Sequence, residues 1–232
     1  MLKTKINKFY KSNECVVLVI LVMVMITFSV INPAFLTARN MFDLFRTMIV
    51  TGIFACGVMM VIINGGVDMS FMAIAICSAY MTIRLALALD YTGPILPLFL
   101  ISALIGMLFG FCNAFLVNTF EIPIFIVTLC LATTIRGLVL NFVGNEYVAS
   151  TEMPECTIEF SKTYLFNRMD GTGSTYGLHF SVFIMLGIML FTHLILNYTI
   201  IGRGVYALGG DSSSAQRLGY NLTGVRMFIY GY

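Results

Sequence analysis

The sequence predicts an all-α membrane protein: a polytopic transmembrane helical bundle with about six complete spans and the start of a seventh. Hydrophobic residues make up 59% of the 232 residues and charged residues only 10%, and the mean hydropathy is +0.94. A soluble domain carries about 25% charged residues, so this chain could not cover a water-facing surface. The apolar residues also fall into runs long enough for helices that cross a bilayer.

The composition and motifs also argue against several functions. A net charge of +2, with no stripe of basic residues, gives no reason to expect nucleic acid as a partner. Five of the six cysteines lie inside apolar runs, and no pair has the spacing of zinc ligands, so neither a disulfide framework nor a metal site is expected. The chain has no Walker A, H-E-x-x-H or G-x-S-x-G motif. We therefore expect no catalytic residue and no cofactor.

The first expected span follows a basic N-terminus. Residues 1–13 carry four lysines, and an apolar run at 15–31 follows. The run is longer than the apolar region of a typical signal peptide, and no small-residue cleavage site follows it. It is predicted to be an uncleaved span whose N-terminus lies in the cytoplasm. Residues 32–46 mix apolar and polar side chains, which favours a short interfacial helix starting near Thr37.

Five further spans are expected, with a break between the first two of them. They are 47–63, 67–89, 95–117, 123–143 and 179–200, and a seventh span begins near Thr223. The Asn64-Gly65-Gly66 triplet ends one span, and the stretch that follows it either crosses the membrane or re-enters it. In the 95–117 span, Gly106 and Gly110 form a small-xxx-small pair that would let a neighbouring helix approach closely.

The number of crossings sets the expected orientation. Six crossings return the chain to the cytoplasm at Gly202, and residues 144–178 then form a long, mostly acidic loop outside. The distribution of Lys and Arg is weakly in favour of this orientation.

Asp68 directly follows the break. A broken span exposes backbone groups, and these are tolerated only beside protein or a water-filled cavity. Asp68 therefore either caps the following helix or lines a polar pathway. Arg136 lies well inside a span, where it could snorkel, pair with Asp68 or Asp90, or line the pathway. The candidate residues of a translocation pathway are Asn64, Asp68, Ser70 and Arg136.

The segment after the sixth span is polar and framed by glycines. Residues 211–218 are predicted to form a short helix, because the Asp211 carboxylate can accept the free N–H groups of a first helical turn. Gly219 suits the position after the helix, because glycine adopts a positive φ without penalty. Two interpretations follow from the pattern: an ordinary loop between spans, or a rigid helix that faces the cytoplasm and contacts a partner.

Four motifs occur in order between residues 65 and 221. They are G-G-V-D-M-S at 65–70, G-F-C-N-A at 110–114, I-P-I-F-I-V-T-L at 122–129 with Arg136-Gly137 following, and G-R-G-V-Y-A-L-G-G-D at 202–211. They resemble the G-G-I-D-L-S, G-x-x-N-G, I-P-P-F-I-V-T-L…R-G and G-R-x-[IV]-Y-A-[IL]-G-G-N patterns of one family. That family comprises the permease subunits of bacterial ABC importers for ribose, xylose, galactosides, other monosaccharides and the autoinducer-2 signal.

The resemblance implies a heteromeric importer in the bacterial cytoplasmic (inner) membrane. Two permease subunits would form the pathway, cytoplasmic ATPase subunits would drive it, and a periplasmic or lipid-anchored sugar-binding protein would deliver the solute. The segment 202–222 would couple the permease to the ATPase. The coupling residues would be Gly202, Arg203, Gly209, Gly210, Asp211, Ser212 and Gly219.

The chain departs from the family pattern at several positions. Phe71-Met72 replace Val-Gly, Ile124 replaces the second proline, and residues 212–214 are three serines where many members have Glu-Ala-Ala. Family members also continue through several more spans. Residues 1–232 are therefore expected to be one permease domain that is incomplete at its C-terminal end. The alternatives are a truncated, non-functional remnant and an ATP-independent secondary transporter or channel, in which Asp68 and Arg136 would couple ions.

Overall fold

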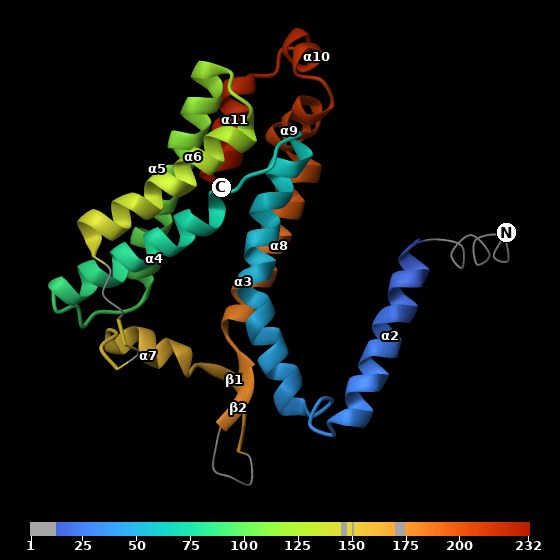
Figure 1. The fold of residues 1–232 in the computed structure, drawn as a ribbon, viewed down its shortest axis with the longest axis vertical. Helices are drawn as coiled ribbons and strands as arrows, with labels where there is room; N and C mark the ends of the chain where they lie inside the picture. Colours follow the sequence, from blue (N-terminus) through green and yellow to red (C-terminus); the bar gives the residue numbers. More distant parts are fainter. Residues whose placement is uncertain (1–12, 145–147, 150, 170–174) are drawn as a thin grey trace, which may run out of the picture. The chain divides into compact units, whose positions relative to one another are not determined.

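The computed structural model describes residues 13–144, 148–149, 151–169 and 175–232. Within them, nearly all regular structure is helical, as predicted (Figure 1). The elements are α2 (Asn13–Ile31), α3 (Ala38–Ile63), α4 (Phe71–Ala88), α5 (Leu96–Phe120), α6 (Ile124–Leu138), the π-helix η1 (Val139–Val143), α7 (Glu155–Ser161), β1 (Tyr164–Met169), β2 (Thr175–His179), α8 (Ser181–Tyr198), α9 (Ile200–Gly210), α10 (Ser212–Arg217) and α11 (Leu222–Gly231).

Five stretches of helix are long and apolar enough to cross a membrane. They are α3, α4, α5, the continuous stretch of α6 and η1, and α8. The apolar part of α2, Cys15–Ile31, is slightly shorter. The predicted helical membrane bundle is therefore confirmed. α4 is a continuous helix of 18 residues, which agrees with a crossing rather than a re-entrant loop.

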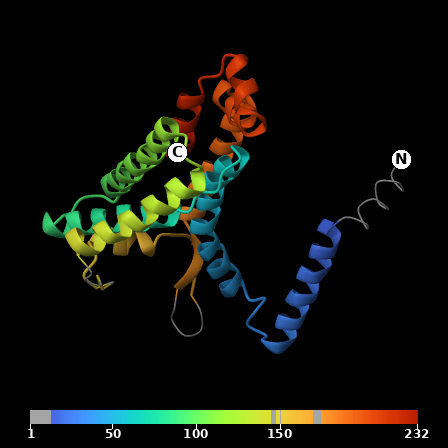
Figure 2. The ribbon, with the colours of Figure 1, turned by 45° about the horizontal axis from the view of Figure 1, so that its top comes forward.

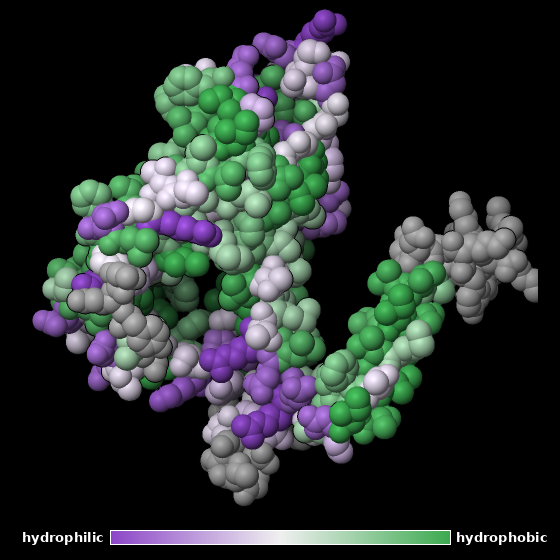
Figure 3. Space-filling view, viewed as in Figure 1, coloured by the Kyte–Doolittle hydropathy of each residue, from purple (hydrophilic) through white to green (hydrophobic). Residues whose placement is uncertain are grey.

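The chain divides into two units. The first comprises Met1–Thr47 and Leu165–Leu178. Its helix α2 exposes apolar side chains along its whole length, and in Figure 3 almost all of its face in view is hydrophobic. A helix that is apolar all round is typical of a membrane span. In the turn that follows α2, Phe35 stacks on Phe28 with ring centroids 5.8 Å apart.

The prediction of a separate interfacial helix near Thr37 is wrong in its extent. A helix does start there, at Ala38, but it continues without interruption to Ile63. No glycine or proline separates residues 38–46 from the apolar run, so nothing stops the helix between them. The lysine-rich residues 1–12 lie outside the described residues, and the orientation therefore stays a prediction.

The acidic loop predicted at 144–178 contains regular structure. It holds the short helix α7 and the two-stranded sheet of β1 and β2. The alternation of apolar and polar residues that predicts a strand is weak over so few positions. The backbone groups of β1 and β2 are satisfied only when the two strands pair with each other.

The second unit comprises Met48–Tyr164 and His179–Tyr232. In it, α5 packs most extensively on α11 and also on α4, and Figures 1 and 2 both show α5 beside α11. The predicted close approach at the small-xxx-small pair is confirmed, but the two glycines face different neighbours. A side chain at Gly110 would overlap the carbonyl oxygen of Tyr230 in α11, whereas a Cβ at Gly106 would lie 3.8 Å from Ile74 in α4.

The two bulky residues at the start of α4 have different surroundings. Phe71 meets Phe54 of α3 edge to face, with ring centroids 5.3 Å apart, and Met72 is half exposed. The expected third stretch also starts later than predicted, at Phe71, because residues 64–70 are taken up by the break.

Candidate functional site

A capped break separates α3 from α4. Gly65 has φ +83°. The N–H of Gly65 donates to the carbonyl of Ile62 at 2.9 Å, and that of Gly66 donates to the carbonyl of Val61 at 3.1 Å. This pair of bonds is the Schellman motif that closes a helix at a glycine. The chain thus leaves α3 with its last carbonyls satisfied and enters a turn of residues 67–70, in which Asp68 and Ser70 are buried while Val67 and Met69 are exposed. Residues 63–70 are here called the break.

Asp68 organises the turn that leads into α4. Its carboxylate is buried, and one oxygen accepts hydrogen bonds from the N–H of Ser70 at 2.6 Å and from the Ser70 hydroxyl at 2.7 Å. The Ser70 hydroxyl in turn accepts a bond from the side-chain amide of Asn113, at 2.7 Å. Ser70 is the N-cap residue of α4. Asp68 therefore holds the residue that begins the helix and ties it, through Asn113, to α5.

Thr128 ties the same turn to α6. Its side chain is fully buried, and its hydroxyl oxygen accepts the N–H of Met69 at 3.1 Å. Thr128 and Asn113 are not among the site residues predicted from the sequence. Both stand inside the quoted motifs, and each is a polar residue in an apolar run, which is the signal that could have identified them.

The structure brings three of the four candidate pathway residues together. Asn64, Asp68 and Ser70 are all buried in the break, whereas Arg136 is exposed near the end of α6. Arg136 lies eight residues after Thr128, a rise of about 12 Å along the helix. Among the described residues, no ion pair joins Arg136 to Asp68 or Asp90.

Some buried polar atoms of the second unit have no hydrogen-bond partner among the described residues. They are Asn64 Nδ2, Asn113 Oδ1, Asn118 Nδ2, Arg226 Nε and Tyr230 Oη. Arg226 also donates to Asn118 Oδ1 at 3.2 Å, which links α11 to the end of α5. Unpaired buried polar groups are costly, so such atoms are expected to meet water or a polar solute.

The predicted short helix is present as α10, with the predicted N-cap. The carboxylate of Asp211 accepts the N–H of Ser213 at 3.2 Å and that of Ser214 at 3.1 Å. Both serine hydroxyls donate to it as well. The hydrogen bonds from the Ser214 and Ser213 side chains, followed by those from the two N–H groups, hold the pKa of Asp211 below its usual range.

The other end of α10 closes as predicted at Gly219. Its φ is +85°. The N–H of Gly219 donates to the carbonyl of Gln216 at 3.0 Å, and the N–H of Tyr220 donates to that of Ala215 at 3.2 Å. This is a second Schellman motif. With both ends capped, α10 is a well-defined helix of six residues, most of whose side chains are exposed.

In the proposed coupling segment, α10 is preceded by the helix α9, one side of which is buried. α9 begins after Thr199, whose hydroxyl accepts the N–H of Gly202 at 3.0 Å. Its buried face includes Val205 and Leu208, which join the core formed by Met60 and Val61 of α3. Gly202 is buried on the same face. The other candidate coupling residues are exposed: Arg203, Gly209, Gly210, Asp211, Ser212 and Gly219.

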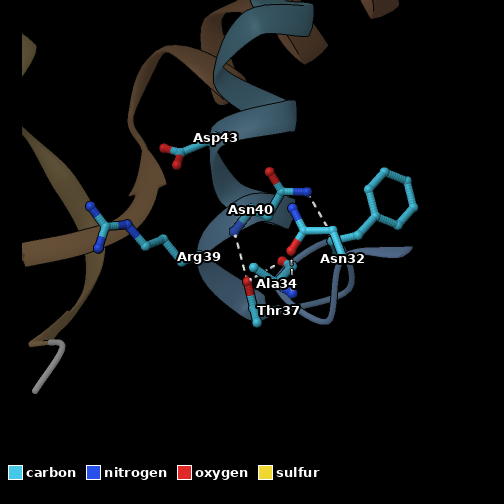
Figure 4. A pocket seen from close by; sticks show the side chains of 7 residues that line it. Asn32, Ala34, Thr37, Arg39, Asn40 and Asp43 are labelled. Atoms are coloured by element: carbon cyan, nitrogen blue, oxygen red, sulfur yellow. Dashed lines mark hydrogen bonds between the residues drawn. The ribbon is translucent and has the colours of Figure 1, made fainter. Parts of the chain in front are cut away.

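A separate pocket of about 260 Å³ lies in the first unit, in the turn between α2 and α3 (Figure 4). Its polar side chains mainly bond the turn itself. Asn32 accepts the N–H of Ala34 at 3.0 Å, and the Thr37 hydroxyl donates to the carbonyl of Ala34 at 2.7 Å. The polar side chains that line the pocket therefore stabilise the turn. Within the described ranges, no three His, Cys, Asp or Glu side chains are placed to hold a metal ion.

Most of the chain matches a known protein family. Residues 40–232 match the family described as the permease component of the branched-chain amino acid transport system. The chain belongs to this family. The match covers the break, both Schellman motifs and α9 to α11. Together with the five apolar helices, membership of this family shows that the chain is a multi-pass membrane protein.

Curated relatives include import permeases for sugars. The chain is 29% identical to the ribose import permease of Haemophilus influenzae over 87% of its own length and 59% of the relative's. It is 30% identical to the ribose import permease of Bacillus subtilis over 90% and 61%, and 28% identical to the fructose import permease of Rhizobium meliloti over 97% and 62%. The chain thus spans about three fifths of these relatives. No solved structure matches it.

Proposed function

We propose that this chain is a transmembrane permease subunit, or the larger part of one, of an ATP-driven ABC importer for a monosaccharide or a related small polar solute. The observation that carries the proposal is α10, a short helix capped at both ends in the place where the sequence resemblance expects the ATPase contact. The names of the relatives support a sugar as solute, since they are import permeases for ribose and fructose.

The partners follow from this role. A cytoplasmic ABC ATPase would bind α10 and hydrolyse ATP, so the permease itself would need no catalytic residue. A second permease subunit would complete the pathway within the lipid bilayer, and a periplasmic or lipid-anchored sugar-binding protein would deliver the solute. The N-terminus, the break, α9 and α10 would then face the cytoplasm, and residues 144–178 the outside, of a bacterial inner membrane.

The proposed pathway residues remain Asn64, Asp68, Ser70 and Arg136. Sugars bind through hydrogen bonds to their hydroxyl groups. The unpaired Asn64 Nδ2 supports a place for Asn64 in the pathway, because it has a donor to offer. Asp68 and Ser70 already form a hydrogen bond with each other. We therefore propose that they form a rigid part of the pathway lining and not a tight binding site for the solute. Transport would be by alternating access, driven through α10.

The test is uptake of labelled ribose or fructose by proteoliposomes that contain the complete permease, its ATPase and its binding protein. We expect uptake that requires ATP and survives collapse of ion gradients. Deletion of residues 212–214 should abolish ATP-driven uptake while membrane insertion is kept. Uptake that follows an ion gradient without the ATPase would show a secondary transporter or channel instead. Failure of the chain to insert or to bind an ATPase would show a remnant.

A further inference from the structure

α9 and the break lie directly against each other. A side chain at Gly209 would overlap the carbonyl oxygen of Ile63, the last residue of α3. On the other side of the contact, a Cβ at Gly65 would lie 4.0 Å from the carbonyl oxygen of Gly209. Only glycine at 209 therefore lets the end of α9 approach the end of α3 this closely. By contrast, Gly187, an exposed position in α8, has nothing within 4 Å of the position of a Cβ.

The break is in turn attached to the three helices that follow it. The Asp68–Ser70 bonds fix the start of α4, and Asn113 links Ser70 to α5. Thr128 of α6 bonds the N–H of Met69. The bonds of Ser70 are buried and that of Thr128 is partly buried, so a displacement of the break would break these bonds or shift at least one of the helices.

α9 is also joined firmly to α10. The N–H of Asp211, the N-cap of α10, donates to the carbonyl of Ala207 in α9 at 3.2 Å. Val205 and Leu208, on the same side of α9 as Gly209, bury that side in the core that contains Met60 and Val61 of α3. A force on α10 is therefore carried along α9 to the end of α3, because close-packed interiors transmit displacement instead of absorbing it.

We infer that the break, residues 63–70, is the joint that passes movement of α10 to α4, α5 and α6, and that Gly209 is a positioning residue of this joint. The inference rests on the proposed function, since it assumes that an ATPase moves α10. In this role, Asp68 and Ser70 hold the joint together, and Thr128 sets its attachment to α6.

The test uses the complete transporter in proteoliposomes and compares Gly209→Ala with Gly187→Ala on α8. The two changes are chemically the same, but only the first places a methyl group against Ile63, and Gly187 lies outside the proposed pathway and the coupling segment. Two quantities are measured: the solute molecules imported per ATP hydrolysed, and the amide hydrogen exchange of residues 64–70. We expect Gly209→Ala to lower the ratio roughly fivefold or more, the lower end of typical coupling between sites, and to speed the exchange. Gly187→Ala should resemble the wild type.

A second pair of variants guards against simple misfolding. Thr128→Val keeps the shape of the side chain and removes the hydroxyl that accepts the Met69 N–H, so it should lower the same ratio. Thr128→Ser keeps the hydroxyl and should preserve it. A purely structural role would reduce inserted protein, and with it ATP hydrolysis and uptake together, at a constant ratio.

The outcomes separate the inference from the proposed function. ATP-driven uptake by the wild type, with Gly209→Ala and Thr128→Val at the wild-type ratio, would overturn the inference alone. A wild-type transporter without ATP-driven uptake would overturn the proposed function and the inference with it. A lowered ratio in both Gly209→Ala and Thr128→Val, with faster exchange at 64–70 in Gly209→Ala and neither change in Gly187→Ala, would support the joint.

Discussion

Asp211 stabilises the first turn of α10 most strongly while its carboxylate is ionised. Its hydrogen bonds from Ser213 and Ser214 go to the charged form, and they lower its pKa in the folded state. The stabilisation is therefore fully present above the pKa of the unfolded chain and is lost as the pH falls through the lower, folded pKa.

This linkage predicts a pH-dependent cap. Hydrogen-exchange protection of the α10 amides, corrected for intrinsic rates, should fall as the pH is lowered from neutral to about 3. Asp211→Asn should flatten this dependence, because asparagine is a good N-cap that does not titrate. An equal loss of protection in the asparagine variant would show that the carboxylate is not responsible.

Ser70 is the residue on which two buried polar partners depend. Ser70→Ala would leave Asn113 Nδ2 without its bond and would remove one of the two bonds to Asp68. We expect a loss of about 1–3 kcal/mol in stability, the usual penalty for a buried unsatisfied group. Thermal unfolding of the detergent-solubilised protein measures it.

The matched control for Ser70 is Thr133→Ala on α6. Thr133 is exposed. Its hydroxyl donates to two backbone carbonyls of its own helix, that of Leu129 at 3.2 Å and that of Cys130 at 2.8 Å. Its loss should change the stability by no more than about 0.5 kcal/mol. Equal effects of the two substitutions would contradict the role assigned to the Ser70 bonds.

At the scale of elements, the contact between α5 and α11 depends on one missing side chain. Gly110 faces the carbonyl oxygen of Tyr230, so the two helices can touch through their backbones. The small-xxx-small spacing predicted that some helix would approach here. The sequence alone does not say which one, because the spacing marks a face of one helix and not its partner.

Gly110→Ala should therefore force α5 and α11 apart. We expect it to destabilise the protein by about 1–3 kcal/mol, as overpacking does. Gly106→Ala is the matched control four residues away. There a methyl group would lie 3.8 Å from Ile74, and the better helix propensity of alanine should leave the stability unchanged or up to about 1 kcal/mol higher. Thermal unfolding of both variants measures these changes in stability. A Gly110→Ala variant as stable as the wild type would contradict the close contact between α5 and α11.

At the scale of the whole molecule, the proposed orientation can be tested with one native cysteine. Cys156 lies in α7 and is partly exposed, in the loop proposed to face outward. A membrane-impermeant maleimide added to right-side-out vesicles should label it. Ser213→Cys on α10 should react only after the vesicles are opened, and Cys156→Ser gives the background. Labelling of Ser213→Cys in sealed vesicles would reverse the orientation.

The sequence by itself determined the helical membrane fold, the position of the break and both ends of α10. These are local properties: hydropathy over about twenty residues, an Asp that accepts N–H groups of the next turn, and glycines that adopt positive φ at 65 and 219. The same local reasoning missed α7 and the β-hairpin, because short elements in a polar stretch carry little periodicity.

Only the tertiary structure decided which residues meet across the chain. It placed Asn113 on Ser70 and Thr128 on Met69, left Arg136 exposed, and set Gly209 against the end of α3. Asp68 could cap a helix or line a pathway on sequence grounds, and the Ser70 bonds show that it holds the start of α4. The physical reason is that such contacts join residues far apart in sequence, and their existence depends on how the helices pack and not on any local preference.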